Sequence, residues 1–175
     1  MGELSAYVLA FARFVIGFVF LWSAGSKLRD FAAFERAVAD FQLSPAVFSR
    51  GVAFFFVSLE LSVTCIMGWS IKFLRNGFII AMFLLVVFSL ALSWVLLRGI
   101  KTSCHCFGAS KKLVSKWDLV RNVCLLGVAS LGYFACNLAE LALTIPELTL
   151  LAFISVAVVA VLTQFQNMSW WFQEM

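Results

Sequence analysis

A short polar segment between two apolar stretches carries two cysteines around the only histidine of the chain, in the order Cys104-His105-Cys106. In an extended backbone, side chains two positions apart point to the same side. A disulfide between two such cysteines would be strained and therefore easily reduced. Nearby cations favour the thiolate, which is the reactive form of cysteine (Arg98, Lys101, Lys111, Lys112). The pattern predicts a disulfide-exchanging pair, with His105 as proton donor or acceptor because imidazole titrates near neutral pH.

The same three residues are also candidate metal ligands. Structural zinc normally takes four ligands from spaced pairs, and no second pair stands in a loop of this chain. We therefore expect no resident metal, and a binder or transporter of a soft metal ion stays as an alternative. A further alternative is that the cysteines are incidental and the chain is a non-catalytic membrane assembly factor.

The other cysteines, Cys65, Cys124 and Cys136, fall in apolar stretches. Buried cysteine most often serves as a small apolar residue, so we expect packing roles for all three. Cys124 lies toward the Cys104 segment, where the alternative role is that of a resolving thiol. Cys65 and Cys136 lie at similar depths, and the alternative for them is mutual contact.

Two charged residues, Arg13 and Glu60, stand near the middle of apolar stretches. A charge at that depth in a membrane is costly and normally finds a partner inside the protein. The simplest expectation is an Arg13–Glu60 ion pair. It would either fix the register of two helices or form the polar floor of a ligand pocket.

Several cations belong to the same side as the Cys104 segment (Lys27, Arg50, Arg98, Arg121). Together they predict an electropositive mouth that stabilises a thiolate, a quinone headgroup or an acidic partner surface. Contact with lipid headgroups explains each cation individually just as well.

The elements that must position these residues are apolar. The chain has 175 residues, of which 63% are hydrophobic and 13% charged, whereas soluble domains have about 25% charged residues. Lipid is therefore the expected solvent. The net charge of +4 is spread over short segments without a long basic run, so we expect membrane lipid and no nucleic acid as a partner.

Five stretches approach the roughly 20 apolar residues that a spanning helix needs, namely 4–24, 51–69, 77–97, 119–139 and 148–165. Lipid requires backbone groups to be satisfied internally, which favours helices. In residues 30–43 the apolar side chains recur at helical spacing, which predicts a short helix along the interface or against the bundle. The expected class is an all-α membrane protein, a single domain over 1–175.

The basic residues predict an orientation. The first and third loops hold eight of them (Lys27, Arg29, Arg36, Arg98, Lys101, Lys111, Lys112, Lys116), whereas the second holds Lys72 and Arg75. The positive-inside rule places the richer side in the cytoplasm, where stable disulfides are rare. A redox role outside the cytoplasm needs the opposite orientation, and the sequence leaves both open.

Several blocks resemble the signature of the methylamine-utilisation MauE family, a branch of the DoxX-like small membrane proteins. They are Arg98-Gly99, Cys104-His105-Cys106-Phe107-Gly108 and Arg121-Asn122, preceded by Arg13, Gly17, Gly25-Ser26-Lys27-Leu28, Phe34, Pro45 and Glu60. The resemblance covers residues 8–137. The family typically has glycine between the cysteines, where this chain has His105, a departure that alters thiol reactivity or adds a ligand.

The resemblance implies a four-helix bundle over about 4–141, so that a fifth helix at 147–166 is an extension. It implies disulfide formation or electron delivery for a thioredoxin-like or secreted cysteine-containing partner, in a bacterial-type inner membrane. By analogy with the four-helix quinone reductases, a quinone is the expected cofactor. The expected catalytic residues are Cys104, His105 and Cys106. The expected cofactor-binding residues are Arg13, Lys27, Glu60, Arg98 and Arg121.

Overall fold

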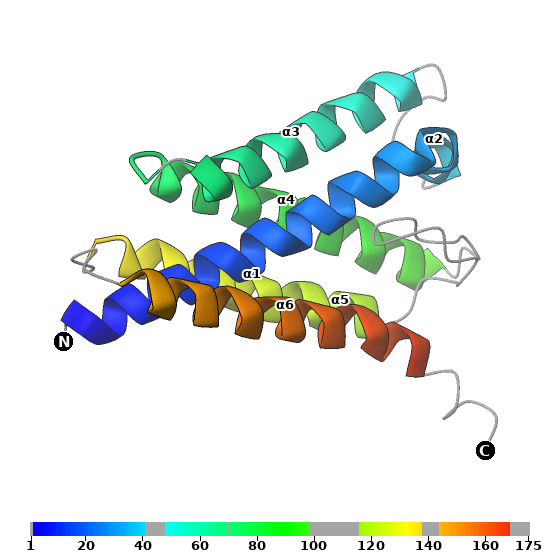
Figure 1. The fold of residues 1–175 in the computed structure, drawn as a ribbon. Helices are drawn as coiled ribbons and strands as arrows, with labels where there is room; N and C mark the ends of the chain where they lie inside the picture. Colours follow the sequence, from blue (N-terminus) through cyan, green and yellow to red (C-terminus); the bar gives the residue numbers. More distant parts are fainter. Residues whose placement is uncertain (1, 41–47, 70, 99–115, 138–143, 169–175) are drawn as a thin grey trace.

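The computed structural model describes residues 2–40, 48–69, 71–98, 116–137 and 144–168, with side chains described between Leu4 and Leu162. Over these ranges the chain forms helices without strands. Their bounds are α1 (Gly2–Arg29), α2 (Phe31–Asp40), α3 (Ser49–Trp69), α4 (Leu74–Arg98), α5 (Lys116–Ala135) and α6 (Ile145–Met168). Figure 1 shows the long helices lying roughly alongside one another.

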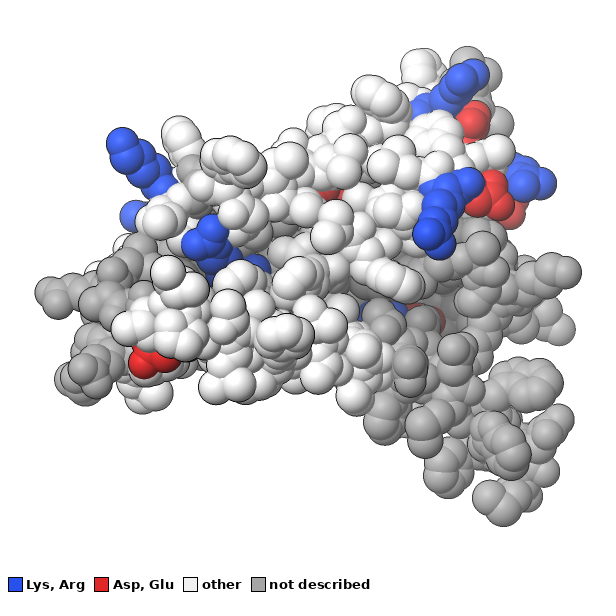
Figure 2. Space-filling view, viewed as in Figure 1, with Lys and Arg blue, Asp and Glu red and all other residues white. Residues whose placement is uncertain are grey.

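Five of these helices are long and apolar enough to cross a membrane: α1 from Leu4, α3, α4, α5 and α6 up to Leu162. Charged side chains gather toward the two ends of the molecule and leave a broad uncharged band between them (Figure 2). A lipid bilayer demands this distribution, because its hydrocarbon core solvates apolar side chains and rejects charges. The predicted fold class is confirmed, and the chain is a multi-pass membrane protein.

Four helices form the core in the cyclic order α1, α3, α4, α5, each packed against its two neighbours in the ring. The core residues Ile16, Phe78 and Leu84 have no exposed surface. α6 packs mainly on α1, on the outside of the ring, with a smaller contact to α5. The functional residues of the core must therefore come from α1, α3, α4 and α5.

The short helix α2 covers one side of the bundle. The side chain of Asp30 accepts a hydrogen bond from the Ala33 amide, which satisfies a free donor at the start of α2. Phe34 is 5% exposed and packs with Ala53 and Val57 of α3. Of the two predicted positions, the structure has the one in which this amphipathic helix packs against the bundle.

A close contact among α1, α4 and α5 depends on Gly132. A Cβ atom at this position would lie 2.4 Å from Cζ of Phe78 and 2.9 Å from Cβ of Ala12. Both distances are shorter than real carbon contacts, so only glycine lets the three helices approach this closely. The contact holds the C-terminal part of α5 against α1 and α4, toward the end of the bundle where α5 ends.

The ends of the core helices sort into two groups. The C-terminal ends of α1 and α4 and the N-terminal ends of α3 and α5 lie together at one end of the bundle, on the right in Figure 1. We call this the loop end, because residues 99–115 connect α4 to α5 there. Cys104, His105 and Cys106 themselves lie outside the described residues.

Candidate functional site

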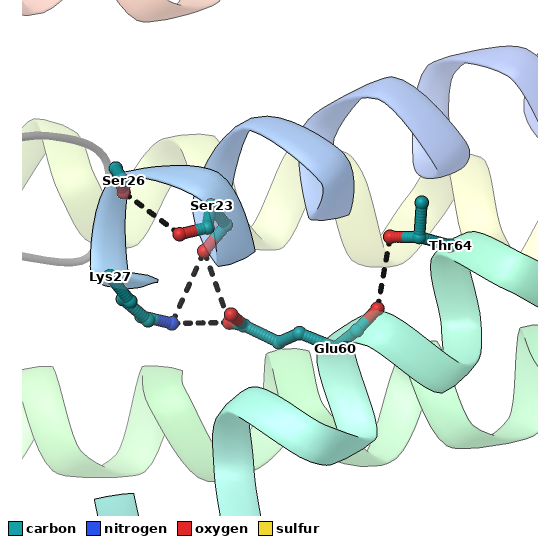
Figure 3. Close-up of polar contacts among 5 residues, drawn as sticks. All are labelled: Ser23, Ser26, Lys27, Glu60 and Thr64. Carbon is teal, nitrogen blue, oxygen red and sulfur yellow. Dashed lines mark hydrogen bonds and ion pairs between the residues drawn. The ribbon is translucent and has the colours of Figure 1, made fainter. Parts of the chain in front are cut away.

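A pair of buried charges lies between α1 and α3. Lys27 donates a hydrogen bond to Oε1 of Glu60 and forms an ion pair with it. Ser23, one turn before Lys27 on α1, donates to the same Oε1 at 3.0 Å and accepts from Lys27 Nζ at 3.2 Å. Figure 3 shows the three side chains converging between the two helices. Ser23, Lys27 and Glu60 form the polar triad of the core.

The polar triad is closed off from the surface. The side chains of Lys27 and Glu60 are 0% exposed. The Lys27 ammonium lies 4.9 Å from the ring centroid of Phe34 and 4.6 Å from that of Phe88. Both distances are within the range of a cation–π interaction. Lys27 is therefore held by a carboxylate, a hydroxyl and two aromatic faces, and it is not a loop cation as the sequence suggested.

The expected Arg13–Glu60 ion pair is wrong. Arg13 donates from Nε to the Met67 carbonyl at 2.6 Å and from Nη2 to the Gly68 carbonyl at 3.2 Å. These carbonyls belong to the last turn of α3, which has no intrahelical donors for them. Arg13 therefore lies level with the end of α3 that is opposite the loop end, whereas Glu60 lies halfway along that helix.

A second cluster of buried polar side chains lies in the first two turns of α5. Asp118, Arg121 and Asn122 are 2%, 6% and 3% exposed. Nη2 of Arg121 lies 3.7 Å from Oδ1 of Asp118, an ion pair between residues about one helical turn apart. Asn122 faces the core, where it lines a small cavity together with Ser23 and Glu60. Asn122 is about 9 Å along α5 from Lys116, at 1.5 Å per residue.

The cavity lies on the axis of the ring, because all four core helices line it. Its apolar walls are Val19, Phe20, Leu85 and Phe88, and its volume is about 10 Å³. Pockets for cofactor-sized ligands have volumes of roughly 300 Å³ or more. The cavity therefore does not fit a quinone ring.

The predicted cofactor-binding residues occupy separate places. Lys27 and Glu60 are in direct contact, and Arg121 lies in the first turns of α5. Arg98 is exposed at the end of α4, with its guanidinium 4.2 Å from the ring of Trp94. Arg13 lies toward the opposite end of the bundle. The structure therefore brings two of the five into contact and spreads the others along the bundle.

The three described cysteines are free. Cys65 and Cys124 are exposed on the outer surfaces of α3 and α5, so the expected packing role is wrong for both. Cys136 follows α5 and is partly buried. Burial raises the pKa of the Cys136 thiol, and the positive charge of Arg75 partly opposes this shift. Cys136 is therefore a poor nucleophile at neutral pH.

Ser23 and Asn122 were not predicted as members of the core site. Ser23 had a usable signal, because it precedes Lys27 by four residues and so shares its helix face. Asn122 appeared in the Arg121-Asn122 block that resembles the family, but its place beside the cavity depends on three other helices and could not be predicted from that block.

The fold and the buried site define a small helical-bundle membrane protein with a charged pair sealed in its core. The chain belongs to the MauE family. The family model, described as methylamine utilisation protein MauE, matches residues 5–135. That range covers α1 to α5, and α6 follows it. No curated protein and no solved structure matches the chain.

Proposed function

We propose that this protein is a membrane thiol–disulfide oxidoreductase in which Cys104 and Cys106 are the exchanging pair. Its partner is a thioredoxin-like protein or a secreted protein with cysteines, and its location is a bacterial-type inner membrane. The observation that carries the proposal is the position of α4 and α5. These two helices flank the cysteine segment in the sequence and pack against each other within the four-helix core.

The exchange needs only two thiol–disulfide couples. A partner thiolate attacks the sulfur of Cys104 in the oxidised pair, and Cys106 leaves as a thiolate that takes up a proton from His105 or water. The second partner thiolate then attacks the partner sulfur of the mixed disulfide and releases Cys104. The partner gains a disulfide, the pair gains two electrons and two protons, and the reverse sequence reduces the partner instead.

The described residues support this chemistry by positioning and by charge. The polar triad joins α1 to α3 near the loop end, and the first turns of α5 bury Asp118, Arg121 and Asn122, so the helices around the cysteine segment are packed together there. Arg50 and Arg98, which are exposed at the loop end, raise the local positive potential that favours thiolates. A lipid-soluble quinone is the proposed carrier that returns the cysteine pair to its starting redox state. Since the core cavity does not fit a quinone ring, the quinone would bind elsewhere.

Trapping a mixed disulfide tests the proposal. The background variant carries C65A, C124A and C136A, because exposed Cys65 and Cys124 would otherwise form adducts of their own. In this background the Cys104 thiolate of C106S can attack the disulfide of an oxidised partner, and the resulting mixed disulfide lacks the Cys106 thiol that would resolve it in the reverse reaction. We expect a reductant-sensitive complex between Cys104 and a thioredoxin-like protein in membranes. The matched control is C104S/C106S, which should form none.

Two results would favour the other functions. Failure to trap any partner with C106S or C104S, together with stoichiometric soft metal bound to the unmodified protein, would indicate a metal binder. Full function after replacement of both cysteines would indicate an assembly factor.

A further inference from the structure

Two buried oxygen atoms in the core lack a hydrogen-bond donor among the described residues. Oε2 of Glu60 and Oδ1 of Asn122 are buried and have no hydrogen-bond partner among the described residues. Glu60 is 0% exposed and Asn122 is 3% exposed. Leaving such an acceptor unsatisfied costs about 1–3 kcal/mol for each group. The two acceptors together therefore demand a donor that the described side chains do not supply.

Both residues line the same cavity on the axis of the bundle. Glu60 comes from α3 and Asn122 from α5, helices that are not neighbours in the ring. The cavity volume of about 10 Å³ is at the lower limit for one water molecule, which needs roughly 10–15 Å³ of this kind of space. The size excludes any larger ligand without movement of the helices.

We propose that this cavity is a binding site for a single water molecule that bridges α3 and α5. The two O–H groups of the water donate to Oε2 of Glu60 and Oδ1 of Asn122. A neutral donor fits because the Lys27 ammonium already balances the charge of Glu60, and a second cation would be repelled by it.

The bridge joins the polar triad to α5. Ser23, Lys27, Glu60, the water and Asn122 then form one continuous hydrogen-bonded chain across α1, α3 and α5. Asn122 stands beside Arg121 and one turn from Asp118 in the helix that follows the cysteine segment. Through this chain, a substitution at the start of α5 alters the surroundings of the buried ion pair without a direct hydrogen bond between the Glu60 and Asn122 oxygens.

A structure of the unmodified protein at a resolution that shows ordered water is the direct test. We expect one peak of density within hydrogen-bond distance of both oxygen atoms. Density in which the Asn122 amide nitrogen donates directly to Glu60 would overturn the proposal, as would a cavity without density.

A double-mutant cycle between E60Q and N122A is the second test, read from thermal unfolding in detergent. We expect the shifts in unfolding temperature to be non-additive, because E60Q replaces the carboxylate by an amide and N122A removes the second acceptor, so both substitutions alter the hydrogen bonds of the same water. The matched control is the cycle of E60Q with G127A, since Gly127 lies on α5 with no heavy atom near its Cβ direction. That cycle should be additive. Additive shifts for E60Q and N122A would overturn the water bridge.

If N122A fails to fold, N122S replaces it in the cycle. The serine hydroxyl keeps an acceptor for the water. The shifts in unfolding temperature of E60Q and N122S should therefore still be non-additive, with a smaller coupling than two residues in direct contact would show. Full independence of the two sites would again contradict the bridge.

Discussion

Lys27 and Glu60 illustrate how a membrane interior tolerates charge. Desolvation of two ions costs more than their attraction returns unless further hydrogen bonds and close packing compensate. Here Ser23 supplies a hydroxyl to the carboxylate, and two aromatic rings supply partial negative charge to the ammonium. The pair is therefore stable as a unit, and each partner depends on the other.

Breaking the pair from one side should be far more damaging than removing it. We expect K27M to lower the free energy of unfolding by about 3–5 kcal/mol, because the Glu60 carboxylate is left buried and unpaired. The double variant K27M/E60M replaces both charges with apolar side chains of similar size and should recover much of that loss. Chemical or thermal unfolding in detergent measures both.

The control for this pair is K72M, since Lys72 is exposed outside the core and its loss should be nearly neutral. Equal stability of K27M and the unmodified protein would show that the ion pair contributes nothing to the fold.

Arg13 acts at the opposite end of the bundle as a cap for α3. Its planar guanidinium reaches two successive carbonyls at once. We expect R13A to lower the free energy of unfolding by about 1.5–3 kcal/mol, the range for hydrogen bonds to charged groups. R13K keeps the charge but offers no fork of donors, so it should recover part of the loss. The same unfolding assay measures both, and equal stability of R13A and the unmodified protein would contradict the capping role.

At the scale of helices, two glycines of α5 lie in very different surroundings, one packed between helices and one in open space. Gly132 faces Phe78 and Ala12 at distances that exclude a side chain, whereas Gly127 has no heavy atom within 4 Å of its Cβ direction. The two glycines lie on one helix and differ only in what surrounds them, so they form a matched pair of positions.

The same substitution should have opposite effects at these positions. We expect G132A to destabilise the protein by about 1–3 kcal/mol, because the added methyl group overpacks a rigid contact. G127A should be neutral or slightly stabilising, because alanine favours the helix by up to about 1 kcal/mol over glycine. Unfolding temperatures measured side by side test this. A G132A protein as stable as G127A would show that Phe78 moves aside freely.

At the scale of the whole molecule, hydropathy predicted the spans and periodicity predicted α2, because lipid and packing act directly on local composition. The partner of Glu60 could not be predicted in the same way. The depth of a residue within its own apolar stretch does not reveal how neighbouring helices are staggered. Lys27 looked like a loop cation because it follows the apolar stretch, but its long side chain reaches back into the core. The cavity could not be predicted either, because its lining residues come from four different helices.

The buried position of Lys27 also changes the charge balance across the membrane. Without it, seven of the eight counted basic residues remain at the loop end. The positive-inside rule still predicts that this end faces the cytoplasm. In a C65A/C124A/C136A/C106S background, a membrane-impermeant maleimide should label Cys104 in inverted vesicles and not in spheroplasts. Labelling in inverted vesicles alone would leave the thioredoxin-like protein as the partner of the two proposed. Labelling in spheroplasts alone would place the pair outside the cytoplasm, where a secreted partner can reach it, and assign the cations to thiol chemistry.

The sealed environment of Lys27 also makes its amine a chemical reporter. An amine-reactive reagent should modify the exposed residues Lys72 and Lys116 quickly in the folded protein. Lys27 should react only when α1 and α3 separate, because Glu60, Ser23 and two rings enclose its nitrogen. Mass spectrometry over time would separate the two rates, and equal rates would contradict the enclosure. The slow rate measures how frequently the bundle opens, without any change to the sequence.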